Sequence, residues 1–549
     1  MRTLDWITLC GTLLFIISYG LWKSRQNATT EQYLLAGRSM PWYAMALSIM
    51  ATQASAITFI STTGQAYVDG MRFVQFYFGL PLAMIVISAT AVPIFHRANV
   101  YTAYEYLEHR FDAKTRALVS IIFLIQRGLA VGVALYAPAI VLTVILGWPE
   151  RLTTILMGTL VVAYTTFGGV KAITWTDFQQ MLIMMFGLAV ALGTAIALLP
   201  ADVGFIDALR LAGAAGRLNA VVTSFDWNDR YNIWTGLLGG MFLALAYFGC
   251  DQSQVQRYLT GKSIAQSRLS LLFNAVAKIP MQFLILLTGA MVFVFYIFEQ
   301  PPVTFHTGQL QQVEAKASGY EKVFLERREA ARQFLQGTAS ATQFHEANTR
   351  MEGVRKQALG SINDTNYVFL NFVTRFLPAG LVGLVLAAIF GAAMSTISAE
   401  INSLATVSVI DIYRRFLRPT QSDVHYLWAS RAATVFWGIY AVTTAGFGRN
   451  LGSLIEAVNM LGSLFYGSLL GVFVLAFAFK HVGGTAAFIA VLIGQTAVFA
   501  ANRFTGISFL WYNVIGCLVV VAVGLLASTQ LPPERDGNAA QRQRQHHVH

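Results

Sequence analysis

Three residues of one apolar segment, Ala392, Ser395 and Thr396, have the types and spacing of a site for a monovalent cation. The segment from Gly391 to Ser403 reads G-A-A-M-S-T-I-S-A-E-I-N-S. Spacing of i, i+3 and i+4 places the three residues on one face of a helix. Two hydroxyls and a carbonyl are uncharged, hard oxygen donors, which suit an alkali cation that must be released again. The alternative is a small-residue face for helix packing, in which Ser and Thr bond to their own helix.

A second polar interruption lies in an apolar run near the N-terminus. Residues Ala51 to Thr58 read A-T-Q-A-S-A-I-T. Such a stretch can unwind within the membrane, where its carbonyls coordinate a cation and its helix ends orient a substrate. A tight helix crossing explains the same small residues.

Two charged residues, Arg127 and Glu400, lie deep inside apolar runs. Arg127 is too far from either end of its run to extend its side chain easily to the membrane surface, so it needs a carboxylate, carbonyls or water. A pair between Arg127 and Glu400 is one hypothesis, in which a structural role is favoured over proton transfer.

Three more polar groups are candidates for contact with a ligand. Lys278 precedes Pro280, which would free backbone carbonyls, so Lys278 could touch a substrate or bind those carbonyls. Tyr247 could pack or stack over a ligand as a gate. Asp177 could cap a helix or supply a carboxylate to a second cation.

Composition indicates a polytopic membrane protein. Apolar residues make up 56% of the 549 residues, and charged residues make up only 12%. The three cysteines lie in apolar runs, which favours neither a disulfide framework nor a metal cluster. Motifs of zinc proteases, phosphate-binding loops and serine hydrolases are absent from the sequence, so we expect no enzyme, no ATP-driven pump and no cofactor beyond a coupling ion.

The sequence predicts about 13 transmembrane helices. The apolar runs lie near 4–21, 43–65, 73–95, 117–147, 152–166, 177–199, 232–250, 270–298, 378–410, 429–447, 454–478, 484–500 and 511–527. An odd number of spans places the termini on opposite sides. Most Lys and Arg residues of the short loops fall on the cytoplasmic side if the N-terminus is outside and the C-terminus is inside. We read the first run as a retained helix and expect a location in a bacterial inner membrane.

Two regions stand outside this pattern. Residues 299–364 contain as many acidic as basic residues and predict a charged helical insert on the outer side, which modulates access or contacts a neighbour. The polar tail, 528–549, is expected to be disordered in the cytoplasm. Residues 1–527, which include this insert, are predicted to form a single transporter domain.

Several motifs resemble the sodium/solute symporter family, which includes sodium-coupled sugar, proline, sialic acid and monocarboxylate transporters. They include Y-L-L-A-G-R-S-M-P-W from Tyr33, Y-T-A-Y-E-Y-L-E-H-R-F from Tyr101, Y-T-T-F-G-G-V-K-A-I-T-W-T-D-F-Q-Q from Tyr164, D-Q-S-Q-V-Q-R-Y-L from Asp251 and M-S-T-I-S-A-E-I-N-S-L-A-T-V-S-V-I-D-I-Y from Met394. They occur in family order over most of the chain.

The resemblance implies a LeuT-type fold with two inverted five-helix repeats, at about 43–199 and 232–478. One extra helix precedes the repeats and two follow them. It also implies alternating access around a midplane site. Carried over from the family, the main sodium site comprises Ala51, Ala54, Ala392, Ser395 and Thr396.

A second sodium site of some family members matches Asp177 together with Ser395 and Ser398. Ala399 stands where those members have another Ser.

The family's substrate pocket, carried over, involves Gln53, Thr58, Gln75, Tyr77, Tyr247, Lys278 and Asn459. Sugar carriers have an amide at the position of Ala244 and an acid at that of Tyr77, so these departures weaken a sugar as the substrate. The run L-Y-A-P from Leu135 resembles the monocarboxylate, vitamin and iodide branch. An organic anion is therefore slightly favoured, and a sugar stays open.

The resulting hypothesis is a sodium-coupled importer of a small polar organic solute, acting as a monomer or weak oligomer without nucleic acid. Two alternatives stay open. A proton-coupled carrier on the same fold would use Glu400 or Asp177. A membrane sensor would bind the solute without moving it.

Overall fold

The computed structural model describes residues 1–23 and 29–531, and every named element in this part of the chain is helical. This confirms the predicted all-helical class. The helices of the main bundle are α1 (Thr3–Lys23), α3 (Trp42–Gln53), α4 (Thr63–Asp69), α5 (Leu80–Ala89), α6 (Ala91–Ala98), α8 (Ala113–Leu146), α9 (Glu150–Ala197), α11 (Gly240–Gly249), α12 (Gln252–Leu259), α13 (Ile264–Phe298), α18 (Leu381–Val407), α19 (Asp423–Thr444), α20 (Leu454–Ala478), α21 (Gly484–Phe504) and α22 (Leu510–Gln530).

Shorter elements connect these helices. They are α2 (Thr30–Leu35), η1 (Ala36–Arg38), η2 (Thr58–Thr62), η3 (Gly70–Tyr77), α7 (Ala103–Arg110), α10 (Phe205–Ala214), η4 (Thr235–Gly239), η5 (Thr307–Gln309), α14 (Leu310–Glu314), α15 (Tyr320–Leu335), α16 (Ala341–Leu359), η6 (Thr365–Tyr367), α17 (Val368–Phe376), η7 (Ser408–Leu417) and η8 (Ala445–Asn450).

The outer surface of the bundle is apolar, as a lipid-facing surface must be. Phe167 and Val276, for example, are 69% and 75% exposed. Among the described residues, nine helical stretches are long and apolar enough to cross a membrane. The count is below the 13 predicted runs because α9 contains two of them and the short α11, the interrupted α3 and the helix α19 do not qualify alone.

Three breaks in the bundle have local causes. After α3 the chain leaves the helical conformation at Ala54 (φ −88°, ψ 72°) and resumes a helix at η2. Between α11 and α12, Asp251 caps the new helix by accepting a bond from the backbone N–H of Ser253. Within α9, Gly169 has φ +59°, a value that glycine adopts at little cost, and it divides the helix into two segments.

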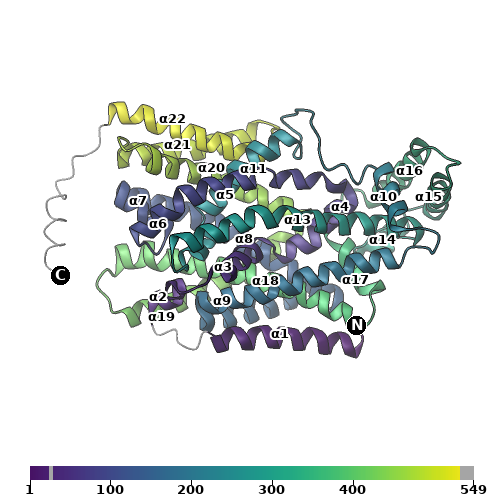
Figure 1. Ribbon diagram of the computed structural model, residues 1–549, viewed down its shortest axis with the longest axis horizontal. Coiled ribbons are helices and arrows are strands. Elements are labelled where there is room, and N and C mark those ends of the chain that lie inside the picture. The colour runs from purple at the N-terminus through teal and green to yellow at the C-terminus, as the bar shows by residue number, and fades with distance from the viewer. Residues whose placement is uncertain (24–28, 532–549) are drawn as a thin grey trace.

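The insert forms a separate helical unit at one end of the bundle, where α14, α15 and α16 project beyond the other helices (Figure 1). Helices α15 and α16 enclose a small core of their own that includes Phe324 and Met351. Helix α1 begins at the same end of the bundle as the insert, whereas α22 ends at the opposite end (Figure 1). The tail beyond Leu531 lies outside the described residues.

Candidate functional site

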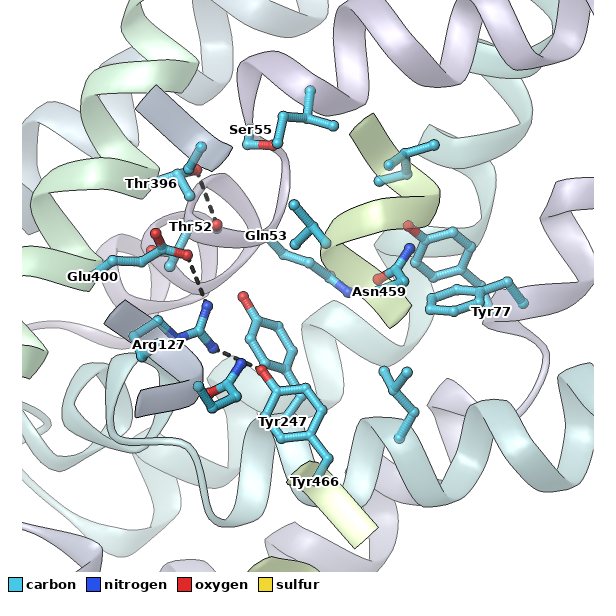
Figure 2. A pocket seen from close by; sticks show the side chains of 17 residues that line it. Thr52, Gln53, Ser55, Tyr77, Arg127, Tyr247, Thr396, Glu400, Asn459 and Tyr466 are labelled. Atoms are coloured by element: carbon cyan, nitrogen blue, oxygen red, sulfur yellow. Dashed lines mark hydrogen bonds and ion pairs between the residues drawn. The ribbon is translucent and has the colours of Figure 1, made fainter. Parts of the chain in front are cut away.

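The break after α3 lies directly beside α18. The Thr396 hydroxyl on α18 donates to the Thr52 carbonyl at 3.1 Å, across the end of α3 (Figure 2). Ala51, Ala54 and Ala392 are all fully buried at this crossing. The last carbonyls of a helix lack partners within it, so the broken end of α3 can offer oxygens to a cation.

Asp177 connects the two candidate sodium sites. Its carboxylate accepts a bond from the Ser395 hydroxyl at 2.6 Å and from the Ser48 hydroxyl at 2.5 Å, and so joins α9, α18 and α3. The Ser398 hydroxyl instead donates to the carbonyl of Ser395 at 3.0 Å. Hydroxyls, carbonyls and one carboxylate are all hard oxygen donors, a set that fits sodium. Sequence reasoning missed Ser48, although it lies on the face of Ala51, three residues away.

Arg127 is held by two carboxylates and a tyrosine. Its Nη1 donates to Glu400 Oε1 at 2.7 Å. Its Nη2 donates to Asp251 and, at 2.7 Å, to the Tyr466 hydroxyl, which in turn donates to Asp251 at 2.9 Å. The guanidinium also lies over the Tyr247 ring, 5.5 Å from its centroid. The cluster thus contains one cation and two acidic side chains, all buried.

Asp251 and Tyr466 had no role in the sequence-based prediction. The signal for Asp251 was present, because it lies two residues after the end of the apolar helix α11, and acidic residues inside a membrane bundle are functional candidates. Tyr466 carried no such signal, since a tyrosine in an apolar helix most often packs.

A cavity of about 80 Å³ lies between these groups. Six of its polar lining residues are Gln53, Tyr77, Arg127, Tyr247, Glu400 and Asn459 (Figure 2). Gln53 Oε1, Asn459 Nδ2 and Glu400 Oε2 are buried without a hydrogen-bond partner among the described residues. Because burying such groups unpaired is costly, they require water or a polar ligand in the cavity.

Three predicted substrate residues do not line this cavity. The Gln75 amide is occupied by backbone groups, donating to the Tyr231 carbonyl at 2.8 Å and accepting from the Val222 N–H at 2.9 Å. Thr58 donates to the Gln53 carbonyl at 3.4 Å. Lys278 is fully buried behind Tyr77, with its Nζ 5.5 Å from the centroid of that ring and no hydrogen-bond partner in the described part of the chain.

Comparison with known proteins identifies the family of this chain and two similar transporters. The model of the family described as "Sodium:solute symporter family" matches residues 33–326 and 333–494. A sodium-coupled monocarboxylate transporter 2 of Bos taurus is 26% identical, over 95% of this chain and 84% of its own length. A sodium/sialic acid symporter of Aliivibrio fischeri is also 26% identical, over 96% of this chain and 93% of its own.

A solved structure has the same fold. It is described as the substrate-bound outward-open state of a sodium-coupled sialic acid symporter, and it covers 97% of this chain and 99% of its own with a TM-score of 0.79 at 23% identity. The fold is therefore LeuT-like, and the chain is a multi-pass membrane transporter for a small solute, not an enzyme. This protein belongs to the sodium:solute symporter family.

Proposed function

We propose that this protein imports a small organic anion together with sodium, by alternating access around the cavity beside the break in α3. The observation that carries the proposal is a set of three side-chain atoms without a hydrogen-bond partner among the described residues, gathered in a cavity next to the candidate sodium ligands. They are Gln53 Oε1, Asn459 Nδ2 and Glu400 Oε2. Relatives named as monocarboxylate and sialic acid symporters support an anion, and a sugar is the second class to test.

The size of the cavity favours the smaller anions in this conformation. A dry cavity of about 150 Å³ can hold benzene, so about 80 Å³ suits a few waters or a very short carboxylate. A larger solute requires the walls to separate. Tyr247 would close over the solute, because its ring lines the cavity beside Arg127 and its hydroxyl is fixed by Gln254 at 2.7 Å.

Sodium acts on the contact between α3 and α18. In the structure, the Thr396 hydroxyl donates to the Thr52 carbonyl, and the Ser395 hydroxyl donates to the Asp177 carboxylate. Bound sodium would use the oxygens of Ala51, Ala54, Ala392, Ser395 and Thr396, and would hold the broken helix against α18. Coupling requires that each ligand bind better when the other is present, and an enhancement of about 5–150-fold is typical.

Asp177 and Ser398 would hold a second sodium ion. The carboxylate already gathers Ser48 and Ser395, so it needs little rearrangement to accept a cation. We further propose that the N-terminus and the insert lie outside the cell and that the C-terminus is cytoplasmic, in a bacterial inner membrane. Oppositely placed helix ends and the distribution of Lys and Arg support this orientation.

Uptake into proteoliposomes tests the proposal. Radiolabelled pyruvate, N-acetylneuraminate and glucose are supplied outside, with an inward gradient of sodium, potassium or protons in separate runs. Uptake of an acid that requires sodium and survives a protonophore is expected. Uptake that persists without sodium and collapses with a protonophore would instead establish proton coupling through Glu400 or Asp177, and binding without uptake would establish a sensor.

The sodium site itself has a direct test. In detergent, NaCl should raise the melting temperature above that in equal KCl, and Ser395→Ala/Thr396→Ala should weaken this effect at least about tenfold in sodium concentration. Thr288→Ala is the matched control, because that buried hydroxyl bonds only to its own helix, at the Leu284 carbonyl. An unchanged sodium response in the double variant would contradict the assignment.

A further inference from the structure

A second cavity, which we call the vestibule, lies between the membrane helices and the insert. Its volume is about 510 Å³, within the range of about 300–1,000 Å³ that is typical of small-molecule sites. Tyr67 of α4 and Phe293 of α13 line it on the side of the bundle. Residues of α15 and α16, and the segment 360–365, line it on the side of the insert.

The vestibule is lined by four cationic and three acidic side chains. They are Arg217, Arg327, Arg355 and Lys356, and Asp69, Glu352 and Asp364. Arg355 donates to both carboxylate oxygens of Asp364, at 2.7 and 2.6 Å, and Arg217 pairs with Glu352. Arg355 and Arg217 therefore each have a carboxylate partner, but the partner of Arg217 is nearly half exposed and Arg217 Nε has no acceptor among the described residues.

Arg327 is not neutralised in this way. It is only 2% exposed, it donates to the Tyr296 carbonyl, and its Nε has no acceptor in the described part of the chain. Burial lowers the pKa of Arg327. Burial also acts to lower the pKa of Arg355, but Asp364, Tyr67 and Tyr320 together raise it by more. A buried cation without a carboxylate partner is costly, and a bound anion would remove that cost.

Neighbouring groups add further donors and apolar surface beside Arg327. Arg217 lies over the Phe293 ring, 4.6 Å from its centroid, and its Nε also has no acceptor among the described residues. Tyr67 packs edge-on against Phe293, with ring centroids 5.7 Å apart. A guanidinium thus stands over one aromatic face, with a second ring packed against it, an arrangement that suits a carboxylate attached to a small apolar body.

We propose that the vestibule binds a small organic carboxylate at Arg327 and Arg217, outside the transport cavity and without sodium. The inference rests on the proposed function in one respect, because it assigns to the vestibule the same class of solute. It also links the insert to the transport cycle. Thr365 lines the vestibule and its carbonyl lies against Gly64 of α4, so an occupant would hold the insert on the outer half of the broken helix.

Equilibrium binding to the purified full-length protein tests the proposal. Pyruvate and N-acetylneuraminate are titrated in sodium-free potassium chloride, and again with sodium, by isothermal calorimetry. We expect sodium-free binding that weakens at high salt, and a loss of about tenfold or more in Arg327→Gln, the factor for one charge-assisted hydrogen bond. Arg332→Gln, an exposed change on the same helix, should leave it unchanged.

The outcomes separate this inference from the proposed function. Arg217→Gln is a second variant in case Arg327→Gln does not fold, as judged by size-exclusion chromatography. Ser395→Ala/Thr396→Ala should remove the effect of sodium and keep the sodium-free binding. Absence of sodium-free binding for both acids, or equal binding in wild type and both arginine variants, overturns the vestibule site. Absence of sodium-dependent binding and uptake overturns the proposed function instead.

Discussion

Neutralising the members of the Arg127 cluster one at a time should produce unequal losses of stability. Arg127→Gln leaves Glu400 and Asp251 as two buried carboxylates without their cation. Breaking a buried ion pair by removing one partner costs about 3–5 kcal/mol, so this variant should lose at least that much. Glu400→Gln leaves Arg127 and Asp251 balanced, and its amide oxygen can still accept from Nη1. The cost of that change should be about 1 kcal/mol, the value of an ordinary hydrogen bond.

Asp251→Asn should fall between these two. It keeps the Arg127–Glu400 pair but weakens the bonds that Asp251 accepts from Tyr466, at 2.9 Å, and from the Ser253 hydroxyl, at 2.7 Å. The double variant Arg127→Gln/Glu400→Gln removes the cation and one of its two carboxylates. It should therefore be more stable than the sum of the single losses predicts, by about 0.5–3 kcal/mol.

Reversible unfolding in mixed SDS and dodecyl maltoside micelles, followed by circular dichroism, measures these differences. Arg151→Gln is the control, because that exposed arginine at the start of α9 should change the free energy of unfolding by less than about 0.5 kcal/mol. The reasoning is refuted if Glu400→Gln is as costly as Arg127→Gln, or if the double variant is additive.

Two further predictions concern regions away from this cluster. Burial acts to raise the pKa of Glu108, but its ion pairs with Arg415 and Arg116 lower that pKa by more. The pKa of Glu108 in the folded protein is therefore below its ordinary value. The stability that Glu108 contributes is present above about pH 4.3 and is lost as the pH falls through its folded pKa. In Glu108→Gln, the free energy of unfolding should therefore fall less steeply with decreasing pH below about 4.3, as measured by acid unfolding curves. Gly64→Ala would force a Cβ onto the Thr365 carbonyl and should cost about 1–3 kcal/mol. Gly353→Ala, with open space around it, should cost nothing, and thermal melts of the two glycine variants measure the difference.

Local sequence was enough to predict the helices and most of the polar positions. Apolar runs of sufficient length become helices in a bilayer because their backbone groups have no other partners there. The i, i+3, i+4 spacing of Ala392, Ser395 and Thr396 placed them on one face for the same local reason. The polar stretch from Ala51 to Thr58 left a break and a tight helix crossing both open, and the structure has a break, at Ala54.

The partners of these groups depended on tertiary structure. Arg127 meets Asp251, which is 124 residues away, as well as Glu400, and Asp177 meets Ser395, 218 residues away. Gln75 has a polar side chain like that of Gln53, but the fold turns it to the backbone at Tyr231 and not to the cavity. Hydropathy and spacing give the depth and face of a residue on its own helix. Which distant helix supplies its partner is decided only by how the helices cross and rotate against one another.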